Sequence, residues 1–340
     1  MLKTAIVILN WNGKDYLEKF LPAVIKYSAL DATAVYVADN GSADGSLSYV
    51  EGNFPGVRII RFDRNYGFST GYNKALAEID AEYFVLLNSD VEVTPGWLSP
   101  LIKLMDEDHQ VAVCMPKIKS FNDKTSFEYA GAAGGFLDRF GYPFCRGRIF
   151  NVIEKDNGQY NDAREIFWAS GACMFVRASL YKKAGGLDDD FFAHMEEIDL
   201  CWRLKNMGYK IMVVPQVEVF HVGGGTLPNN NPHKLFLNFR NNLWLLCKNV
   251  QRKKLAGILM FRLVFDGIAA FVFLFSFRPD FFYSVLKAHW SFWRSTDQIR
   301  IKRKENLKLF WNYKHREIYR SSIVLNFFIK RIRTFRNLKI

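Results

Sequence analysis

An α/β fold, with a mostly parallel central sheet flanked by helices, is predicted by two features of the sequence. Short runs rich in Val, Ile, Leu, Phe and Tyr alternate with helical patterns up to about residue 105, as in βαβ units. Polar residues follow the ends of these runs, at the position where ligands bind to an open parallel sheet. The expected strands cover residues 5–9, 34–38, 57–62 and 83–87.

Polar residues directly after these strands are expected to line one crevice. Asn10 follows the first strand, Asp39 the second and Asn65 the third, and the fourth continues into Asn88-Ser89-Asp90. Gly67 would permit close approach of the backbone to a ligand. Each of these residues alone is more often part of a plain turn or a helix cap. The prediction therefore depends on the whole ordered set.

The middle of the chain gives weaker signals. Residues 115–165 are rich in Gly and aromatic residues, show little periodicity and are expected to be irregular. The elements expected after them are a strand over residues 167–177, a helix from about residue 178 to the glycine pair 185–186, and a second helix over about residues 194–206.

The second of these helices begins with paired carboxylates. Glu196 and Glu197 fall in its first turn, where the helix dipole favours negative charge, and one of them can project into the crevice. Asp199 and Arg203 are four residues apart and are expected to pair on the outside of the helix. Taken alone, the two glutamates could equally well satisfy backbone donors at the helix start.

In their order along the chain, these segments resemble glycosyltransferase family 2, the inverting GT-A enzymes, and within it the rhamnosyltransferase-like members of bacterial cell-surface polysaccharide synthesis. His221 is one residue of this set; considered without the other segments, it would more often be a loop histidine bonded to a carbonyl. The resemblance runs from about residue 4 to residue 249 and implies the GT-A nucleotide-diphospho-sugar transferase fold. The segments that carry it are VILNWN (7–12), ADNGSADGS (38–46), NYGFSTGYN (65–73), LLNSD (86–90), SGA (170–172), GGLD (185–188), EEIDLCWR (196–203) and His221 with the glycines at 223–225.

The resemblance implies a divalent Mg²⁺ or Mn²⁺ cofactor. Asp90 matches the last Asp of the family's DxD motif and would bind the metal, with His221 as a candidate second ligand, since Mn²⁺ tolerates imidazole. The cation would neutralise the charge that grows on the departing diphosphate. Asn88 stands where many relatives have Asp, which argues against metal contact and leaves it a role in ribose or sugar binding.

The nucleotide-sugar donor is also assigned its residues by the resemblance. Asp39 matches the aspartate that accepts a hydrogen bond from N3–H of uracil or thymine. The other residues expected to hold the donor are Asn10, Asn65, Gly67, Asn73, Asn88, Ser89 and Asp90.

Glu197 stands at the position of the family's catalytic base, one methylene longer than the usual Asp. It would take the proton of the acceptor hydroxyl, and Glu196 would orient the acceptor or the base. Direct attack by the acceptor would invert the anomeric configuration without a covalent intermediate.

Charge is distributed unevenly along the chain. Residues 248–340 contain 21 basic and five acidic residues, a net charge of +16, and since the whole chain carries +12, residues 1–247 carry −4. A basic segment interleaved with Phe, Trp and Tyr indicates an anionic partner, either a membrane or a nucleic acid. The absence of a recognition motif argues against nucleic acid.

An apolar stretch over residues 255–277 could either cross a membrane or lie at its surface. Arg262 and Asp266 interrupt it, and each would cost about 2.5–3.5 kcal/mol at a bilayer centre. An interfacial amphipathic region is therefore predicted, and packing on the catalytic domain with a solvated basic face is the alternative. The cations expected to contact anionic lipid are Arg278, Lys287, Arg294 and the stretch 300–304.

The expected organisation is a catalytic domain over residues 1–249, followed by a basic helical region over residues 250–340. Within the catalytic domain, residues 1–115 would bind the nucleotide sugar and residues 116–249 the acceptor. The five cysteines have no metal or redox spacing, which indicates reduced, buried thiols in the cytosol. The first residues are too briefly apolar for a signal peptide. We expect a protein that is peripheral on the cytoplasmic face of the bacterial inner membrane.

The predicted function is metal-dependent, inverting transfer of a sugar from a UDP- or dTDP-sugar to a hydroxyl of a saccharide, lipid-linked in the expected case, during polysaccharide synthesis. A sugar-phosphate nucleotidyltransferase is one alternative, but it would need a Gly-rich loop with a catalytic basic residue after the first strand, which residues 10–14 do not supply. A non-catalytic sugar-nucleotide-binding membrane scaffold is another, but it would lack the base or the metal ligands, and both are present.

Overall fold

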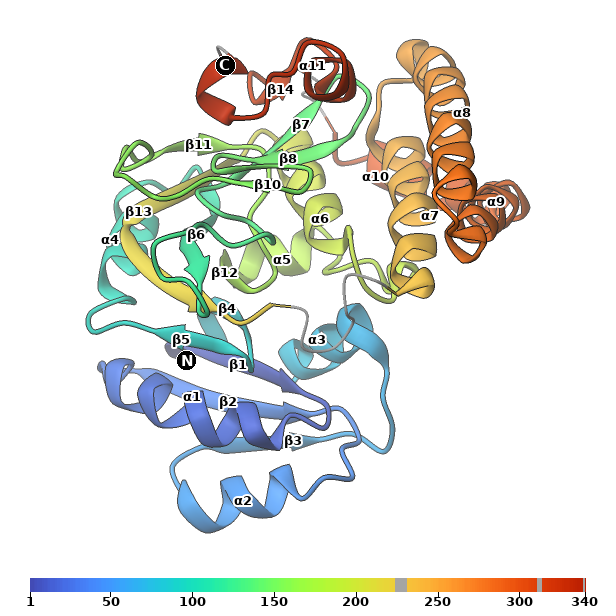
Figure 1. Cartoon of the computed structure of the whole chain (residues 1–340). Helices are drawn as coiled ribbons and strands as arrows, with labels where there is room; N and C mark the ends of the chain where they lie inside the picture. The colour runs from blue at the N-terminus through green and yellow to red at the C-terminus, as the bar shows by residue number, and fades with distance from the viewer. Residues whose placement is uncertain (224–230, 311–313, 339) are drawn as a thin grey trace.

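A mixed nine-stranded sheet lies at the centre of the computed structural model, which describes residues 1–223, 231–310, 314–338 and 340. Its strands are β1 (Leu2–Asn10), β2 (Thr33–Asp39), β3 (Arg58–Arg61), β4 (Ala81–Asn88), β5 (Val91–Val93), β6 (Val111–Ser120), β11 (Arg164–Ile166), β12 (Cys173–Arg177) and β13 (Lys210–His221). They follow the order β11-β13-β6-β12-β4-β1-β2-β3, and β5 pairs with β13 (Figure 1). Only β5, β11 and β12 run against the others, so the mostly parallel sheet is confirmed.

The strands and helices form where the apolar pattern places them. Val7 and Leu86, on the adjacent strands β1 and β4, are completely buried, as expected for parallel strands covered on both faces. All five cysteines are free and four are buried, as predicted. The helices up to residue 206 are α1 (Lys14–Tyr27), α2 (Ser46–Asn53), α3 (Gly67–Ala77), α4 (Ser99–Glu107), α5 (Ala178–Lys183) and α6 (Glu196–Asn206).

A second sheet occupies much of the segment that we expected to be irregular, so that expectation is wrong. Its strands are β7 (Gly135–Asp138), β8 (Pro143–Cys145), β9 (Arg148–Ile149), β10 (Val152–Ile153) and β14 (Ile318–Tyr319), in the order β10-β9-β8-β7-β14. Strands of two to four residues are too short for an alternating pattern to be visible in the sequence.

Four helices after residue 231 lie beside the two sheets (Figure 1). They are α7 (Pro232–Asn249), α8 (Arg252–Phe275), α9 (Pro279–Arg294) and α10 (Thr296–Leu307). Among the described residues, α8 alone is long and apolar enough to cross a membrane by length and composition. The chain then returns to the second sheet through β14, α11 (Ile323–Phe328) and the 3₁₀ turn η2 (Phe335–Leu338), where Ile323 N donates to Asp138 Oδ2 over 2.9 Å.

The basic stretch 300–304 in α10 does not present all its cations to the outside. Lys302 pairs with Asp188, and Arg303 donates to the carbonyl oxygen of Cys247 near the end of α7. The expectation that the whole stretch contacts lipid is therefore wrong for these two residues. The reason is that α10 packs against α7, which turns these cations toward buried oxygens of the catalytic part.

Candidate active site

Asn10, the last residue of β1, is the centre of a buried hydrogen-bond network. It lies opposite Asp39 in the parallel β1–β2 pair, and its Nδ2 is 3.0 Å from Asp39 Oδ1 and 2.9 Å from Ser46 Oγ. Ser42 N donates to Asp39 Oδ2 over 3.0 Å. Because a carboxylate oxygen accepts more than one hydrogen bond, Asp39 keeps acceptor capacity for a ligand.

Gly13 joins this network to the end of β4. A Cβ on Gly13 would lie 2.6 Å from Asn10 Oδ1 and 3.4 Å from Ser89 Oγ, so the absence of a side chain at Gly13 lets Asn10 and Ser89 approach the backbone there. Asn10 Oδ1 is buried without a hydrogen-bond partner. An acceptor of this kind indicates a site that a ligand completes. Asn10 and Ser89 were predicted from the sequence as site residues, and Gly13 was not.

Asn40, which the sequence analysis also missed, holds the loop after β3 against the end of β2. Its Nδ2 lies 3.0 Å from Asn65 Oδ1 and 3.1 Å from Gly67 O, and its Oδ1 accepts from Tyr66 N over 2.9 Å. The side chain of Asn65 is exposed. Asn65 and Gly67 therefore lie at the same sheet edge as Asp39.

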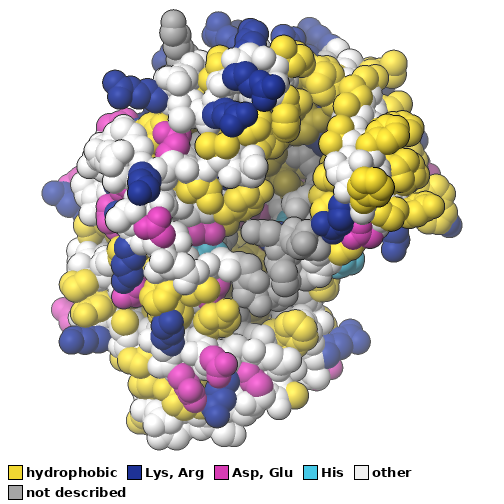
Figure 2. All heavy atoms as spheres, in the orientation of Figure 1, with side chains coloured by type: hydrophobic (Ala, Val, Ile, Leu, Met, Phe, Trp, Pro, Cys, Tyr) yellow, Lys and Arg dark blue, Asp and Glu magenta, His cyan; other side chains and the backbone are white. Residues whose placement is uncertain are grey.

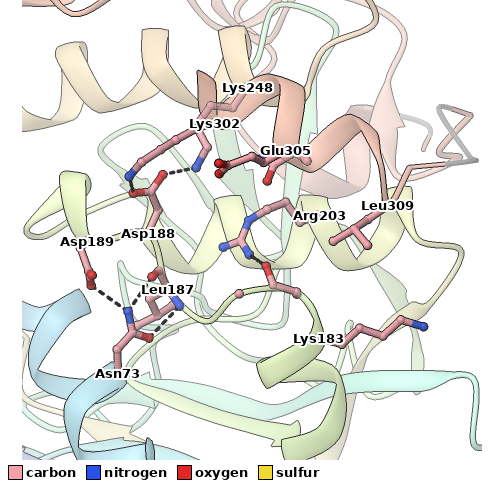
Figure 3. Close-up of a pocket in the computed structure, with 13 residues that line it drawn as sticks. Asn73, Lys183, Leu187, Asp188, Asp189, Arg203, Lys248, Lys302, Glu305 and Leu309 are labelled. Carbon is pink, nitrogen blue, oxygen red and sulfur yellow. Dashed lines mark hydrogen bonds and ion pairs between the residues drawn. The ribbon is translucent and has the colours of Figure 1, made fainter. Parts of the chain in front are cut away.

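The side chain of Asn73, in contrast, is hydrogen-bonded to the turn at residues 187–189 and to Tyr181 (Figure 3). Its Nδ2 donates to Leu187 O and to Asp189 Oδ1, both over 2.7 Å, and its Oδ1 accepts from Leu187 N and from Tyr181 OH. These four bonds use both donors and both lone pairs of the amide. The structure thus gives Asn73 the role of tying α3 to the turn at residues 187–189, and its contacts do not support nucleotide binding.

Asp90 and His221 meet at the end of β4, together with a third ionisable residue. Asp90 lies in the turn between β4 and β5, and pairing of β5 with the end of β13 brings His221 to it. His221 Nε2 is 3.1 Å from Asp90 Oδ1 and 3.5 Å from Asn88 Nδ2, and His221 Nδ1 is 3.4 Å from Glu128 Oε2. Glu128 is buried and was missed, because it lies in the segment without a clear pattern. Of the glycines after His221, those at 224 and 225 lie outside the described residues.

The charges of this cluster stabilise one another. Burial alone would raise the pKa of Asp90, but the hydrogen bond and charge of His221 outweigh burial and hold it below its usual value. Burial alone would lower the pKa of His221, but Asp90 and Glu128 overcome this and raise it to about 10. In the protein alone, His221 therefore carries a positive charge between two carboxylates.

The spacing of Asp90 and His221 fits a divalent cation. Two ligands about 2.1 Å from an octahedral cation lie about 3.0 Å apart in adjacent positions, and Asp90 Oδ1 and His221 Nε2 are 3.1 Å apart. Within the described parts of the chain, no group of three or more His, Cys, Asp or Glu residues could hold a metal ion. These two residues can thus supply part of a coordination shell that a ligand such as a diphosphate would complete.

Glu196 and Glu197 open α6 as predicted, and they are largely withdrawn from solvent. The Oε2 atom of each is buried without a hydrogen-bond partner. Burial raises the pKa of Glu197 to about 7. Burial, followed by the charge of Glu197, raises the pKa of Glu196 well above its usual value. Unpartnered buried carboxylates are costly and are typical of catalytic sites.

The segment 170–172 connects the glutamates to the end of β4. Asn88 N donates to Ala172 O over 3.0 Å. A Cβ on Gly171 would lie 3.9 Å from Glu197 Cβ and 3.1 Å from Phe68 Cζ. Gly171 therefore lies between Glu197 and Phe68 in the first turn of α3, and a side chain there would crowd Phe68. The structure thus brings Glu197 to the sheet edge that carries Asn88 and Asp90.

The loop before α6 is strained and is held by α7. Phe192, His194 and Met195 have φ angles of 64°, 69° and 75°, which non-glycine residues rarely adopt. The buried Nδ2 of Asn241 lies 2.9 Å from Ala193 O and 2.8 Å from His194 O. Nothing in the sequence of α7 marked Asn241, yet its amide fixes the direction in which α6 begins.

Asp199 and Arg203 pair, but not on the outside of α6 as predicted. Arg203 Nε lies 2.8 Å from Asp199 Oδ2, and both residues are buried. The prediction was wrong because α7 covers this side of α6 and adds Lys248, whose Nζ is 2.8 Å from Asp199 Oδ2 and also pairs with Asp188 (Figure 3). A buried ion network thus joins α6, α7 and the turn after α5.

Comparison with known proteins gives a separate line of evidence. Residues 5–185 match the family described as Glycosyl transferase family 2. The N-acetylglucosaminyl-diphospho-decaprenol L-rhamnosyltransferase of Mycobacterium tuberculosis is 27% identical over 234 residues, which cover 64% of this chain and 75% of that protein. The rhamnosyltransferase WbbL of Escherichia coli is 25% identical over 225 residues, which cover 64% of this chain and 82% of that protein.

Solved structures with similar folds carry nucleotide ligands and Mn²⁺. The mannosyltransferase PcManGT of Pyrobaculum calidifontis, in complex with GDP-Man and Mn²⁺, has a TM-score of 0.52 at 13% identity, and the match covers 90% of this chain and 84% of that one. GalNAc-T7 with UDP, GalNAc and Mn²⁺ has a TM-score of 0.54 at 16% identity, and the match covers 72% and 48% of the two chains. At these identities the likeness shows the fold.

Proposed function

Because this chain belongs to glycosyl transferase family 2 and is a glycosyltransferase with the GT-A fold, as its motifs predicted, we propose that it transfers a sugar, with inversion, from a nucleoside diphosphate donor to a lipid-linked saccharide. The observation that carries the proposal is the meeting of two clusters at one sheet edge. Asp90 and His221 lie 3.1 Å apart and could both reach one cation once His221 gives up its proton. Glu197 is partly buried, and its Oε2 is buried without a partner.

The donor would bind across the ends of β1, β2 and β4. Asp39 would accept a hydrogen bond from the base, with Asn10 holding the carboxylate in place. The unpartnered Asn10 Oδ1 would accept a hydrogen bond from the donor, for example from a ribose hydroxyl. Asn65 and Gly67 would close over the base from the loop after β3. These assignments suit a UDP- or dTDP-sugar.

Asp90 and His221 would hold Mg²⁺ or Mn²⁺, which when bound neutralises charge on the diphosphate leaving group. Glu128 would then act through His221, because a carboxylate beside the second ring nitrogen fixes the tautomer of a metal-binding histidine. Asn88 would contact the sugar or ribose instead of the metal.

Glu197 would take the proton of the attacking hydroxyl. A general base works best when its pKa lies near the working pH, and burial brings the pKa of Glu197 to about 7. Glu196 is more deeply buried, burial holds its pKa well above the usual value, and in its protonated form it could donate a hydrogen bond to the acceptor.

The acceptor is proposed from the relatives. The Mycobacterium tuberculosis protein is named as acting on an N-acetylglucosaminyl-diphospho-decaprenol, so a sugar linked through a diphosphate to a polyprenol is the acceptor class to test first, with rhamnose as the first sugar. Such an acceptor would place the enzyme on the anionic cytoplasmic face of a bacterial membrane, in polysaccharide synthesis.

A thermal-stability screen tests the donor site directly. Purified full-length protein is heated with UDP-, dTDP- and GDP-sugars, with Mn²⁺ or with excess chelator. A ligand at about 100 times its Kd should stabilise the fold by about 2.7 kcal/mol. We expect uridine or thymidine diphosphate sugars to raise Tm in Mn²⁺ and to lose most of this effect in chelator. Stabilisation by GDP-sugars alone would contradict the assignment of Asp39, and equal stabilisation in chelator would contradict the metal site.

A further inference from the structure

Two charged residues interrupt the apolar sequence of α8, and both face the inside of the molecule. Arg262 and Asp266 are buried and pair over 3.1 Å. Tyr142 OH donates to Asp266 Oδ1 over 3.0 Å, and His289 Nε2 of α9 lies 3.1 Å from Asp266 Oδ2. Arg262 also donates a hydrogen bond to Asn242 Oδ1 of α7. The pair therefore ties α8 to the catalytic part and to α9. After the exposed basic residues 252–254 at its start, the exposed side chains of α8 carry no charge.

The outward faces of α8 and α9 form one large apolar surface. Figure 2 shows hydrophobic side chains gathered over these helices. Phe275 is 79% exposed, Trp290 60% and Trp293 54%, values far above those of aromatic residues in a packed interior. We call this surface the α8–α9 face; its exposed members are Met260, Leu263, Val264, Ile268, Phe271, Val272, Leu274, Phe275, Tyr283, Leu286, Trp290 and Trp293.

The composition of the α8–α9 face matches a bilayer interface. Tyr283, Leu286, Trp290 and Trp293 recur every three or four residues and form one stripe of α9. The exposed cations Lys287 and Arg294 flank this stripe, one turn after Tyr283 and Trp290. Trp and Tyr prefer the headgroup level of membranes, and neighbouring Lys and Arg side chains reach anionic headgroups. A face of this kind has the charge that complements an anionic leaflet.

We propose that the α8–α9 face inserts into the interfacial layer of an anionic membrane, with α8 and α9 lying in the plane of the bilayer. Crossing of the membrane by α8 is incompatible with the observed contacts, because Arg262 and Asp266 would have to leave Tyr142 and α7. Of the cations predicted to contact lipid, Lys287 and Arg294 flank this face, whereas Lys302 and Arg303 are turned toward Asp188 and Cys247.

The same contacts connect the membrane to the site. Ala288 of α9 packs with Phe236 and Leu237 of α7, and Asn241, one turn further along α7, holds the loop that leads into Glu196 and Glu197. Docking through α9 would thus fix the height of the base above the lipid surface. This inference rests on the membrane location proposed above but not on the transfer reaction itself.

The test is binding of the full-length protein to liposomes without substrate. We expect sedimentation with phosphatidylglycerol-containing vesicles, weaker binding to pure phosphatidylcholine, and quenching of Trp fluorescence by lipids brominated near the headgroup. Trp290→Ser/Trp293→Ser should lower the partition coefficient by about tenfold or more and remove most of the quenching. Lys287→Glu/Arg294→Glu should abolish the preference for anionic vesicles.

Matched controls come from exposed aliphatic residues away from the face. Ile329, 71% exposed, follows α11, and Ile153, 43% exposed, lies in β10 of the second sheet. Their changes to Ser should leave vesicle binding unaltered. Wild-type protein that binds neither kind of vesicle would overturn the proposal. A dimer that the Trp290→Ser/Trp293→Ser change dissociates would also overturn it and would assign the face to a second copy of the chain. Transfer to a water-soluble acceptor analogue, measured in parallel, shows whether the transferase itself still works, so that the two proposals fail separately.

Discussion

The two edges of the site that we propose to bind the donor and the acceptor, called the donor edge and the acceptor edge below, differ in how their polar groups are satisfied. At the donor edge, Asn10, Asp39 and Ser46 bond mainly to one another, and Asn10 Oδ1 is left over. At the acceptor edge, Glu196 and Glu197 each have a buried oxygen without a partner, and the loop before them is strained. The first edge is thus built to receive a ligand with little rearrangement, whereas the second stores free energy that an acceptor can release.

This difference has a structural origin. The donor edge consists of the ends of parallel strands whose register fixes neighbouring side chains. The acceptor edge is the start of α6, positioned by Asn241 and by the buried ions Asp188, Asp199 and Lys248. Buried groups that lower stability are common where activity needs them. Mutations at the donor edge should therefore change mainly activity, whereas mutations at the acceptor edge should change both activity and stability.

The largest expected effect is at the metal site. Asp90→Ala removes one of two proposed ligands, and turnover should fall by about 10³ or more, since electrostatic stabilisation of the leaving group is lost. The fold should persist, because His221 keeps Glu128 as a partner. Steady-state assays across Mn²⁺ concentrations, with Glu92→Ala on the outside of β5 as the control, check this. Unchanged activity of Asp90→Ala, or of wild type in excess chelator, would remove the metal from the mechanism.

Glu197→Gln should lower kcat by about 10² while donor binding is retained, because Gln keeps the shape but cannot take a proton. In the wild type, the rate should fall about tenfold for each pH unit below about 7, where Glu197 becomes protonated. The residual rate of Glu197→Gln should lack this dependence. If Glu196→Gln is the more damaging change, the roles within the pair are reversed.

Much of the donor edge could be predicted from the sequence, for a physical reason. Asn10, Asp39 and Asp90 each follow an apolar strand, and parallel strands bring such positions to one edge whatever the intervening loops do. Glu128 and Asn241 could not be found in this way. Their positions depend on how a loop and a helix pack on the catalytic part, and no local pattern records that packing.

Two sets of contacts that the sequence did not indicate have the same cause. Asn73 lies within a motif whose beginning is at the crevice, but by that point α3 has carried the chain away from it. Asp199 and Arg203 have the spacing of a surface pair, but spacing alone does not show which side of a helix another helix covers. Periodicity identifies faces, and only tertiary contacts identify what each face meets.

Glu128→Gln should weaken Mn²⁺ binding by about tenfold, because Gln cannot hold the tautomer and charge of His221 as a carboxylate does. Mn²⁺ binding followed by electron paramagnetic resonance, with saturating UDP and without acceptor, measures this independently of turnover. Restoration of kcat by excess Mn²⁺ is expected, since Glu128 acts on the metal site alone. A lower kcat at saturating metal would instead place Glu128 in contact with the substrate.

Glu197→Gln should also stabilise the fold at alkaline pH. The pKa of Glu197 is raised by burial to about 7, so the folded state holds a proton that the unfolded state releases above about pH 4.5. Wild-type stability should therefore fall as pH rises from about 4.5 to 7, by about 1–3 kcal/mol, and this loss should be absent in the variant. Urea unfolding at pH 5 and pH 8 measures it. Equal pH dependence in both proteins would mean that Glu197 is not held in a desolvated state.

The smallest effect on activity is expected at Asn73, and it separates a clamp from a ligand-binding residue. Asn73→Ala removes four hydrogen bonds to the turn at residues 187–189 and to Tyr181, so the free energy of unfolding should fall by about 1–3 kcal/mol. The donor KM should change by less than about threefold, because the donor edge is untouched. Asn65→Ala is the matched variant: its side chain is exposed in the loop that faces the donor, and its donor KM should rise by about tenfold with a smaller loss of stability. If Asn73→Ala raises the donor KM as much as Asn65→Ala does, a change in the 187–189 turn alters donor binding, and the two edges of the site are not independent.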